Sequence, residues 1–358
     1  MNHYGVIMAG GGGTRFWPLS RQKKPKQLLN LTGSDLMVNE AVDRMAAVIG
    51  KSNIFIVTSE LQAPDMTVAT AGRVFPMNIL AEPCARNTAT CIGYCAMEIL
   101  KKYGDGVMVI TPADHYIKNT AALTDAFKKA ILTAEEQDKL ITIGLKPSFA
   151  STAFGYIKCG GTTQSGIHQV LGFKEKPDAQ TAQQYLESGE YLWNSGMFIW
   201  KASLILEKLK AYAPDIYADL EKIGNAMNTP DEQAVLHEVY PQIKKLSIDY
   251  AVMEPSASMG DVLVIPCDCG WNDVGSWDMM DVLHRKDENG NVLLGDVAVI
   301  DVKGSVVYSS KRAVTALGVD NVIIVETDDA VMVCAKDRAQ DVKLIVDALA
   351  QKGRNELL

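Results

Sequence analysis

The 358-residue sequence lacks a long hydrophobic run, a basic excess and a paired-cysteine motif. No uninterrupted apolar stretch reaches the roughly 18 residues of a membrane-spanning helix. The formal net charge is −8, whereas a non-specific nucleic-acid binder carries a basic stripe, so we expect neither a membrane nor a nucleic acid as partner. A locally basic pocket for an anionic substrate is compatible with this charge.

The seven cysteines are odd in number and scattered. Cys91 and Cys95 would share one face of a helix, and Cys267 and Cys269 alternate along an expected strand. Neither pair has the CxxC or histidine partner typical of a zinc site. The N-terminus enters a strand-like run at Tyr4, which leaves no room for a signal peptide. We therefore expect free thiols in a cytoplasmic protein.

What the sequence does contain is the alternating pattern of an α/β enzyme. Residues 1–285 switch between short β-branched runs and stretches with apolar residues at helical spacing. This alternation predicts a Rossmann-like, mostly parallel sheet with helices on both faces, which binds ligands at the carboxyl ends of its strands. Strands are expected at 6–9, 54–58, 107–111, 140–144, 169–173 and 197–200, and helices at 36–49, 88–102 and 123–136.

The C-terminal part has a different texture. Residues 291–335 are rich in Val and Ile and are broken by Gly304 and Gly318, which predicts a compact all-β unit, followed by a helix at 338–349. We therefore divide the chain into a catalytic domain at 1–285 and a small β-rich domain at 286–358.

A glycine-rich loop follows the first expected strand. It does not end in the GK[ST] of a P-loop, and Arg15 occupies the third glycine position of a dinucleotide fingerprint. Glycine lets the backbone approach a ligand closely, so the loop amides suit a phosphate chain. Arg15 and Lys26, which follows Pro25, are two cations that could clamp a triphosphate. The loop residues expected to bind the nucleotide are Gly10, Gly11, Gly12, Gly13 and Thr14.

Two aspartates are candidate metal ligands. Asp114 follows the expected strand at 107–111, and Asp273 lies on a glycine-bounded turn in GWNDVG at 270–275. Two carboxylates together with substrate phosphates are the usual ligands of protein-bound Mg²⁺. From spacing alone, the alternative is that each aspartate caps a turn or a helix.

Two further motifs suit a sugar phosphate, namely FKEKP at 173–177 and WNSG at 193–196. Lys176, stiffened by the following proline, is a candidate partner for the phosphate. Glu175 and Asn194 carry groups that hydrogen-bond vicinal hydroxyls, and Gly155 would let a sugar approach the backbone. The alternative for Lys-Glu-Lys is a solvated charge cluster.

Glu82 is the candidate for recognition of the base. Guanine offers N1–H and N2–H₂ side by side, and one carboxylate can accept both, whereas adenine has no such pair. Asn87 belongs to the same segment, AEPCARNT at 81–88, and is included in the nucleotide site. The alternative is that Glu82 is only a charge at a helix entry.

The run GGGGTRFWPLS at 10–20, followed by PKQ at 25–27, resembles the signature of the sugar-1-phosphate nucleotidyltransferases, and within them the mannose-1-phosphate guanylyltransferases. The resemblance recurs through most of residues 1–280. It implies that Asp114 and Asp273 bind the metal, that FxEKP and WNSG line the sugar-phosphate pocket, and that backbone groups help to read the base. It also implies that the C-terminal unit is a truncated left-handed β-helix that helps to form a homodimer. The family often continues RNTA with proline where this chain has Thr90.

Together these patterns predict transfer of GMP from GTP to mannose 1-phosphate, with Mg²⁺ as cofactor. The sugar phosphate is already ionised, so catalysis would consist of positioning and charge neutralisation, with Arg15, Lys26 and Lys176 as the catalytic cations. The alternatives are the same chemistry with another sugar 1-phosphate or nucleoside triphosphate, and a catalytically silent regulator that binds GDP-mannose. Some longer members of the resembled family carry an isomerase domain, and we expect this chain to be monofunctional.

Overall fold

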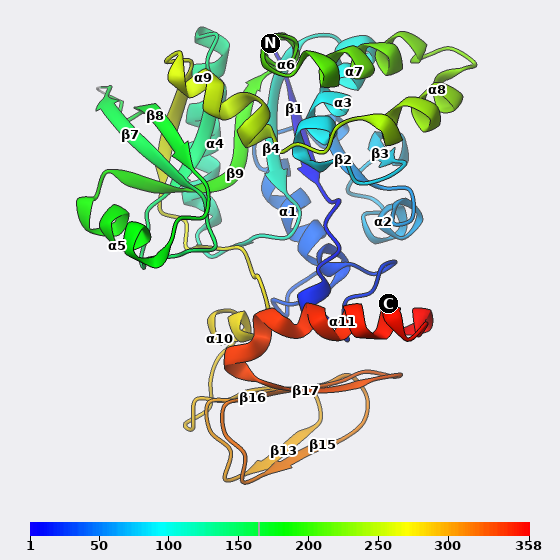
Figure 1. The fold of residues 1–358 in the computed structure, drawn as a ribbon, viewed down its shortest axis with the longest axis vertical. Helices are drawn as coiled ribbons and strands as arrows, with labels where there is room; N and C mark the ends of the chain where they lie inside the picture. Colours follow the sequence, from blue (N-terminus) through cyan, green and yellow to red (C-terminus); the bar gives the residue numbers. More distant parts are fainter. Residues whose placement is uncertain (164) are drawn as a thin grey trace.

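The computed structural model describes residues 1–163 and 165–358, and its largest element is a nine-stranded sheet with the strand order β3-β2-β1-β4-β9-β6-β10-β8-β7 (Figure 1). Each strand expected from the sequence lies in this sheet. The strands are β1 (Asn2–Met8), β2 (Ile54–Ser59), β3 (Ile79–Glu82), β4 (Gly106–Pro112), β6 (Leu140–Leu145), β7 (Tyr156–Thr162), β8 (His168–Lys174), β9 (Tyr191–Lys201) and β10 (Val262–Cys267).

The sheet is mixed, although its first half is parallel. Strand β1 pairs in parallel with β2 and β4, and β2 pairs in parallel with β3. Strand β9 is inserted between β4 and β6 and runs antiparallel to both, and β8 is antiparallel to β10 and β7. The α/β fold class is confirmed, and the parallel strands β1 to β4 bring their carboxyl ends to one edge.

Helices cover both faces of the sheet, because successive residues of the inner strands point to opposite sides. In β4, Met108 and Ile110 belong to one hydrophobic cluster, whereas Val107 and Val109 belong to another. The first cluster is covered by α3 (Asn87–Lys102), α6 (Ala202–Tyr212) and α7 (Pro214–Ala226), and the second by α1 (Met37–Ala46) and α4 (Thr120–Glu136). None of the helices in the described part of the chain is long and apolar enough to cross a lipid bilayer.

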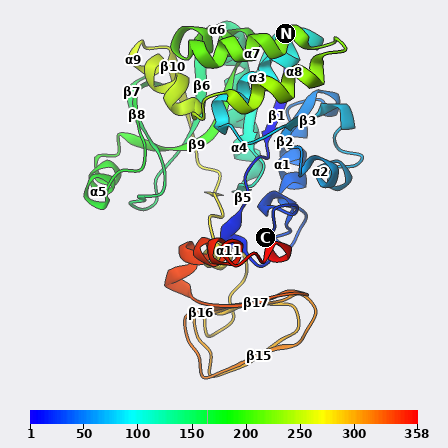
Figure 2. The ribbon, with the colours of Figure 1, turned by 45° about the vertical axis from the view of Figure 1, so that its right-hand side comes forward.

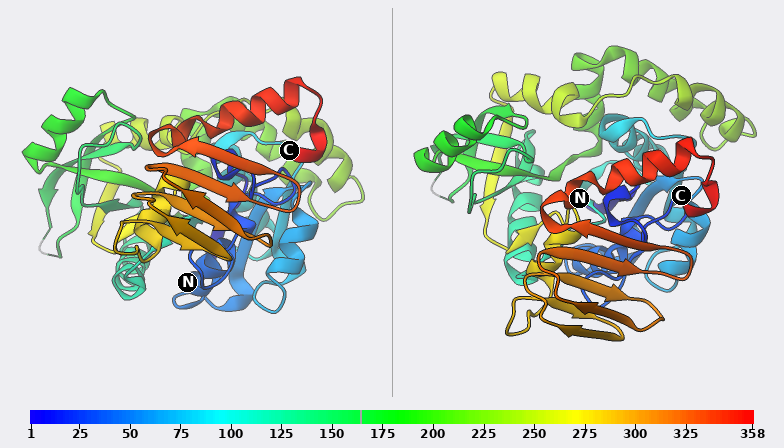
Figure 3. Two further views of the ribbon diagram at one scale, coloured as in Figure 1. Left: turned by 90° about the horizontal axis from the view of Figure 1, so that it is seen from below. Right: turned by 60° about the horizontal axis from the view of Figure 1, so that its bottom comes forward.

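The C-terminal domain is built from short strands that stack in successive turns of the chain (Figure 3). One layer contains three parallel strands and a final antiparallel one, and a second layer contains two parallel strands. The layers are β12 (Val292–Leu294), β14 (Val306–Ser309), β16 (Val322–Glu326) and β17 (Val331–Ala335), and β13 (Val297–Ile300) and β15 (Val314–Leu317). The expected β-rich, β-helix-like unit is confirmed, while the boundary after residue 285 stays a prediction.

The C-terminal domain packs on the segment that follows the glycine-rich loop, and α11 (Val342–Gln351) lies between the two parts (Figure 2). A shared hydrophobic cluster joins Phe16, Trp17 and Trp277 to residues of β14 and β16. Trp17 Nε1 donates a hydrogen bond to the Leu357 carbonyl over 2.8 Å, and Trp277 Nε1 donates to the Trp17 carbonyl over 3.0 Å. The segment that follows the loop is therefore held by both Trp277 and the C-terminal end of the chain.

Candidate active site

The glycine-rich loop runs from the end of β1 to the short 3-10 helix η1 (Thr14–Phe16). Gly13 has φ 60, and a Cβ atom there would lie 2.4 Å from Lys26 Cβ, so only glycine fits. A Cβ atom at Gly11 would meet no other atom within 4 Å, so this part of the loop faces open space. The loop backbone is thus accessible to a ligand, as the sequence predicts for a phosphate chain.

Lys26 links the loop to both candidate metal ligands. It begins the 3-10 helix η2 (Lys26–Leu28) and is 5% exposed. Its Nζ donates to Asp114 Oδ2 over 2.9 Å and to the Asp273 carbonyl over 2.6 Å. Gln27, which the sequence analysis did not single out, donates its Nε2 to the Ala9 carbonyl over 2.6 Å and so holds the loop.

Asp114 and Asp273 are brought together by a two-stranded ribbon between distant parts of the chain. Strand β5 (Tyr116–Ile117) pairs antiparallel with β11 (Trp271–Asn272), and the aspartates lie beside these strands. Val274 has φ 47 although it is β-branched and fully buried, so the turn after Asp273 is strained. The surrounding fold holds the Asp273 turn in this conformation.

These residues line one cavity of about 240 Å³. The cavity contains the two cations that the sequence analysis assigned to the triphosphate, Arg15 and Lys26. It also contains the two carboxylates that were assigned to the metal, Asp114 and Asp273. The lining residues are Gly13, Thr14, Arg15, Phe16, Lys26, Asp114, His115, Asp273 and Gly275.

The two carboxylates differ in their electrostatic surroundings. Burial raises the pKa of Asp114, but the charge and hydrogen bond of Lys26 act in the opposite direction, and the pKa lies below its ordinary value. The pKa of Asp273 is raised by burial, which Lys26 opposes and the nearby charge of Asp114 reinforces. No group of three or more His, Cys, Asp and Glu side chains able to hold a metal occurs among residues 1–163 and 165–358. Two oxygen ligands that repel each other nevertheless fit Mg²⁺ whose other ligands are phosphates and water.

His115 lies in the cavity as a neutral ring. Burial lowers its pKa to about 4, even though Asp114 opposes this shift. Trp271 Nε1 donates to His115 Nδ1 over 3.0 Å, and because an indole N–H is only a donor, the imidazole proton must be on Nε2. Arg44, on α1, donates its Nη2 to the His115 carbonyl over 2.9 Å and supports this turn from behind.

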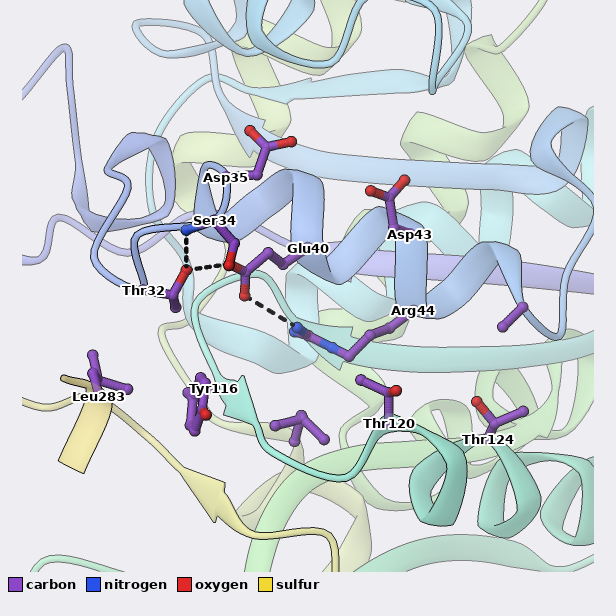
Figure 4. A pocket seen from close by; sticks show the side chains of 12 residues that line it. Thr32, Ser34, Asp35, Glu40, Asp43, Arg44, Tyr116, Thr120, Thr124 and Leu283 are labelled. Carbon is purple, nitrogen blue, oxygen red and sulfur yellow. Dashed lines mark hydrogen bonds and ion pairs between the residues drawn. The ribbon is translucent and has the colours of Figure 1, made fainter. Parts of the chain in front are cut away.

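Arg44 belongs to a second cavity, of about 510 Å³, between α1 and the residues that follow β5. Figure 4 shows its guanidinium reaching toward Glu40, which lies 3.8 Å away. Because Arg44 lines this cavity and also bonds the His115 carbonyl, it connects α1 to the turn that carries Asp114. The sequence analysis missed it, since an arginine on a helix has no distinctive local signal.

The predicted sugar-phosphate residues converge where β7, β8 and β9 meet. A Cβ atom at Gly155 would lie 2.3 Å from Glu175 Oε1 and 3.4 Å from Asn194 Cβ, so the three residues are in contact. The Asn194 N–H also donates to the Gly155 carbonyl over 2.8 Å. Lys176 follows Glu175 with φ 44 and is exposed, and within the described residues it has no ion-pair partner.

Asp249 joins this group and was not predicted as a site residue. It begins the π-helical segment η6 (Asp249–Met253), and Asn194 Nδ2 donates to its Oδ1 over 2.7 Å. Burial raises the pKa of Asp249, and burial followed by the charge of Asp249 raises the pKa of Glu175. The sequence analysis did not single out Asp249, whereas the structure brings its carboxylate to the predicted sugar-binding residues.

Glu82 and Asn87 lie outside the lining of the 240 Å³ cavity. Glu82 ends β3, is 5% exposed, and would have its Oε2 3.3 Å from a Cβ atom at Gly10. Its Oε1 accepts a hydrogen bond from the Tyr240 hydroxyl, and burial raises its pKa to about 7. Asn87 begins α3 with φ 70, is exposed, and its Oδ1 accepts from the Thr88 N–H over 2.8 Å.

Comparison with known proteins supplies the family. Residues 4–290 match the nucleotidyl transferase family, and residues 295–349 match the mannose-phosphate isomerase/GMP-like β-helix domain. The xanthan biosynthesis protein XanB of Xanthomonas campestris is 41% identical over 98% of this chain and 74% of its own length. The mannose-1-phosphate guanylyltransferase of Klebsiella pneumoniae is 38% identical over the same shares of the two chains.

A solved structure is similar to this chain over nearly its whole length. The crystal structure of a protein described as mannose-1-phosphate geranyltransferase, from Thermus thermophilus, superposes with a TM-score of 0.87 at 30% identity, covering 98% of this chain and 100% of that one. The cavity with its two cations and two carboxylates lies within the part matched by the first family. On these grounds the chain belongs to the nucleotidyl transferase family and carries a β-helix domain at its C-terminal end.

Proposed function

We propose that this enzyme transfers GMP from GTP to mannose 1-phosphate, giving GDP-mannose and pyrophosphate. The observation that carries the proposal is the cavity in which Arg15 and Lys26 face Asp114 and Asp273 beside an open glycine-rich loop. The names of the relatives from Klebsiella pneumoniae and Escherichia coli, both mannose-1-phosphate guanylyltransferases, support the choice of sugar and base.

In this reaction a phosphate oxygen of the sugar phosphate forms a bond to the α-phosphorus of the triphosphate. The bond between the α-phosphorus and the bridging oxygen breaks in line, and pyrophosphate leaves with that electron pair. The attacking oxygen is already ionised at neutral pH, so no residue needs to remove a proton. His115, neutral with its proton on Nε2, is accordingly not needed as a base.

The chain's own residues then act by orientation and charge. Arg15 and Lys26 bind the triphosphate, and the Asp273 carbonyl keeps the Lys26 ammonium at the cavity wall. We assign Asp114 and Asp273 as the ligands of Mg²⁺, which would neutralise charge on the phosphates when bound.

For the sugar phosphate, we assign Glu175 and Asn194 as hydrogen-bond partners of the hydroxyls, because their two polar side chains meet beside Gly155. Lys176 supplies the charge for the phosphate, and its exposed ammonium is available for this role.

For the base, we assign Glu82, with Asn87 at the start of α3 as a neighbouring contact. Each carboxylate oxygen has two lone pairs, so Glu82 can accept from Tyr240 and from guanine at the same time. Recognition in this form requires the ionised carboxylate, and with a pKa of about 7 a substantial fraction of Glu82 is protonated at neutral pH.

We further propose a cytoplasmic homodimer that uses the C-terminal domain. The β-helix domain leaves apolar side chains exposed, among them Ile300 at 66% and Leu317 at 70%. Exposed apolar side chains on one domain favour association with a second protein surface. Light scattering of the purified protein would measure its mass, and a monomer at micromolar concentration would exclude this dimer.

The function is tested by following pyrophosphate release with Mg²⁺, each nucleoside triphosphate and a panel of sugar 1-phosphates. We expect GTP with mannose 1-phosphate to give the highest kcat/KM. A higher kcat/KM for another pair would keep the chemistry and change the substrates, and no turnover with any pair would contradict the proposal.

A further inference from the structure

Arg15 is oriented by the C-terminal domain. Its Nη1 donates to Gln340 Oε1 over 2.8 Å and to the Gly275 carbonyl over 3.2 Å. No ion pair in the described part of the chain includes Arg15, and the residue is exposed. A long exposed side chain without such contacts would sample many rotamers, so these two hydrogen bonds determine where the guanidinium lies.

Gln340 is itself held in a directed chain of hydrogen bonds. Its Nε2 donates to Ser276 Oγ over 2.6 Å, and Ser276 Oγ donates to the carboxylate of Asp278. Because arginine only donates and the Ser276 hydroxyl proton is used toward Asp278, the amide of Gln340 has one consistent orientation. The carboxylate at the end of the chain accepts without donating, which fixes the polarity of all three bonds.

The backbone that carries Gln340 is fixed as well. Gln340 lies on the 3-10 helix η8 (Lys336–Asp341), and its neighbour Ala339 is buried in the cluster that contains Phe16 and Trp277. Lys336 Nζ bonds both carboxylate oxygens of Asp281 over 2.9 Å each. The C-terminal domain therefore presents Gln340 to Arg15 from a rigid support.

We propose that Gln340 is a positioning residue of the active site, through which the β-helix domain orients the Arg15 guanidinium toward a bound triphosphate. The proposal rests on the assigned role of Arg15 as a phosphate ligand. A neutral amide suits this task, because it accepts a hydrogen bond from Arg15 without neutralising the charge that the phosphates need. A carboxylate at the same place would compete with the phosphates for the guanidinium.

The test measures binding of inorganic tripolyphosphate with Mg²⁺ by calorimetry, for the wild type and for Gln340→Met, which keeps the length of the side chain and loses both hydrogen bonds. We expect Gln340→Met to bind about 10-fold more weakly, and Gln340→Glu to bind at least as weakly as Gln340→Met. In an Arg15→Met background, Gln340→Met should cause no further loss, because it acts through Arg15. Gln351→Met, at the end of α11, is the matched control and should bind like the wild type.

Steady-state kinetics add a readout that a merely structural role would not give. Gln340→Met should lower kcat/KM for GTP about 10-fold and leave KM for mannose 1-phosphate unchanged, with an unchanged melting temperature. Unchanged or tighter binding of tripolyphosphate, or an equal loss in both Arg15 backgrounds, would overturn the proposal. Tripolyphosphate has neither base nor sugar, so an error in the assigned substrates would leave this binding result intact.

Discussion

Replacing the two cavity aspartates by asparagine, one at a time, should separate catalysis from stability, because the structure gives the two carboxylates different partners. Asp114 Oδ2 forms an ion pair with Lys26 over 2.9 Å, and the Lys26 side chain is only 6% exposed. Asp273 offers Lys26 its backbone carbonyl, which a side-chain substitution leaves in place. The two variants should therefore lose activity alike and differ in their free energy of unfolding.

The magnitudes follow from these partners. Asparagine keeps the shape of each ligand and removes its charge, so each variant should lose at least about 100-fold in kcat, or about 2.7 kcal/mol of transition-state stabilisation. Asp114→Asn should also lower the free energy of unfolding by about 1–3 kcal/mol, because a buried ammonium loses its counter-charge. Asp273→Asn should leave stability unchanged or slightly higher, since it removes a carboxylate that burial and Asp114 disfavour.

Single-turnover rates across a Mg²⁺ titration measure the loss of activity, and denaturant unfolding at several pH values measures the change in the free energy of unfolding. The pKa of Asp114 is lowered in the folded state, so its contribution to stability is present above its unfolded pKa and is lost as the pH falls through the folded pKa. The stability difference between wild type and Asp114→Asn should accordingly shrink in acid. Near-normal turnover by folded Asp273→Asn, or an equal loss of stability in both variants, would refute this reasoning.

Three further substitutions test the remaining sites. Because the pKa of Glu82 is higher in the folded state, the folded protein binds the Glu82 proton more tightly than the unfolded chain does. The free energy of unfolding of the wild type should therefore fall by up to about 3 kcal/mol between pH 4.5 and about 7. In denaturant titrations, Glu82→Gln should remove this dependence on pH. The same variant should lose about 1.5–3 kcal/mol in kcat/KM for GTP and much less for ITP, whereas equal losses would assign base selection to backbone groups. Lys176→Ala should raise KM for mannose 1-phosphate and lower kcat while calorimetry finds GTP binding unchanged, and weaker GTP binding would move Lys176 to the nucleotide side. Asp249→Asn should raise KM for mannose 1-phosphate about 10-fold without changing KM for GTP, because the Asn194 amide loses its charged acceptor. An unchanged KM for mannose 1-phosphate would show that this contact does not position Asn194.

The fold could be predicted from the sequence to the extent that its pattern is local. Apolar alternation in β4 and helical spacing in α3 mark both the element and the faces that it buries. The insertion of β9 between β4 and β6, antiparallel to both, could not be predicted in this way. A fully buried strand has the same composition in either direction, because its neighbours are chosen by tertiary packing.

In the 240 Å³ cavity as well, residues in local motifs could be predicted from the sequence, whereas contacts between distant segments could not. Gly13 and Arg15 were identified because they lie in a glycine-rich run that follows a strand, and Lys26 was identified because it is a cation directly after Pro25. The approach of Asp114 to Asp273 depends on the pairing of β5 with β11, and each of these strands has only two residues. Such a short ribbon leaves no periodic signal. The sequence therefore identified the two aspartates as candidate ligands, and only the resemblance implied that they bind one metal together.

Three of the residues that sequence analysis missed share one property, which is that each contacts a predicted site residue from a helical segment far away in the chain. Tyr240 donates to Glu82, Asp249 accepts from Asn194, and Gln340 accepts from Arg15. Tyr240 is fully buried in a hydrophobic cluster, and Asp249 and Gln340 lie on short helical segments, so none of the three stands in a local motif that marks it as the partner of a site residue. The role that we propose for each of these residues is to pair with a donor or acceptor of the site residue that would otherwise have no partner. This pairing forms only when the chain folds. The residues that we propose to contact substrate were therefore found in motifs, whereas the residues that we propose to orient them were found from hydrogen bonds in the structure.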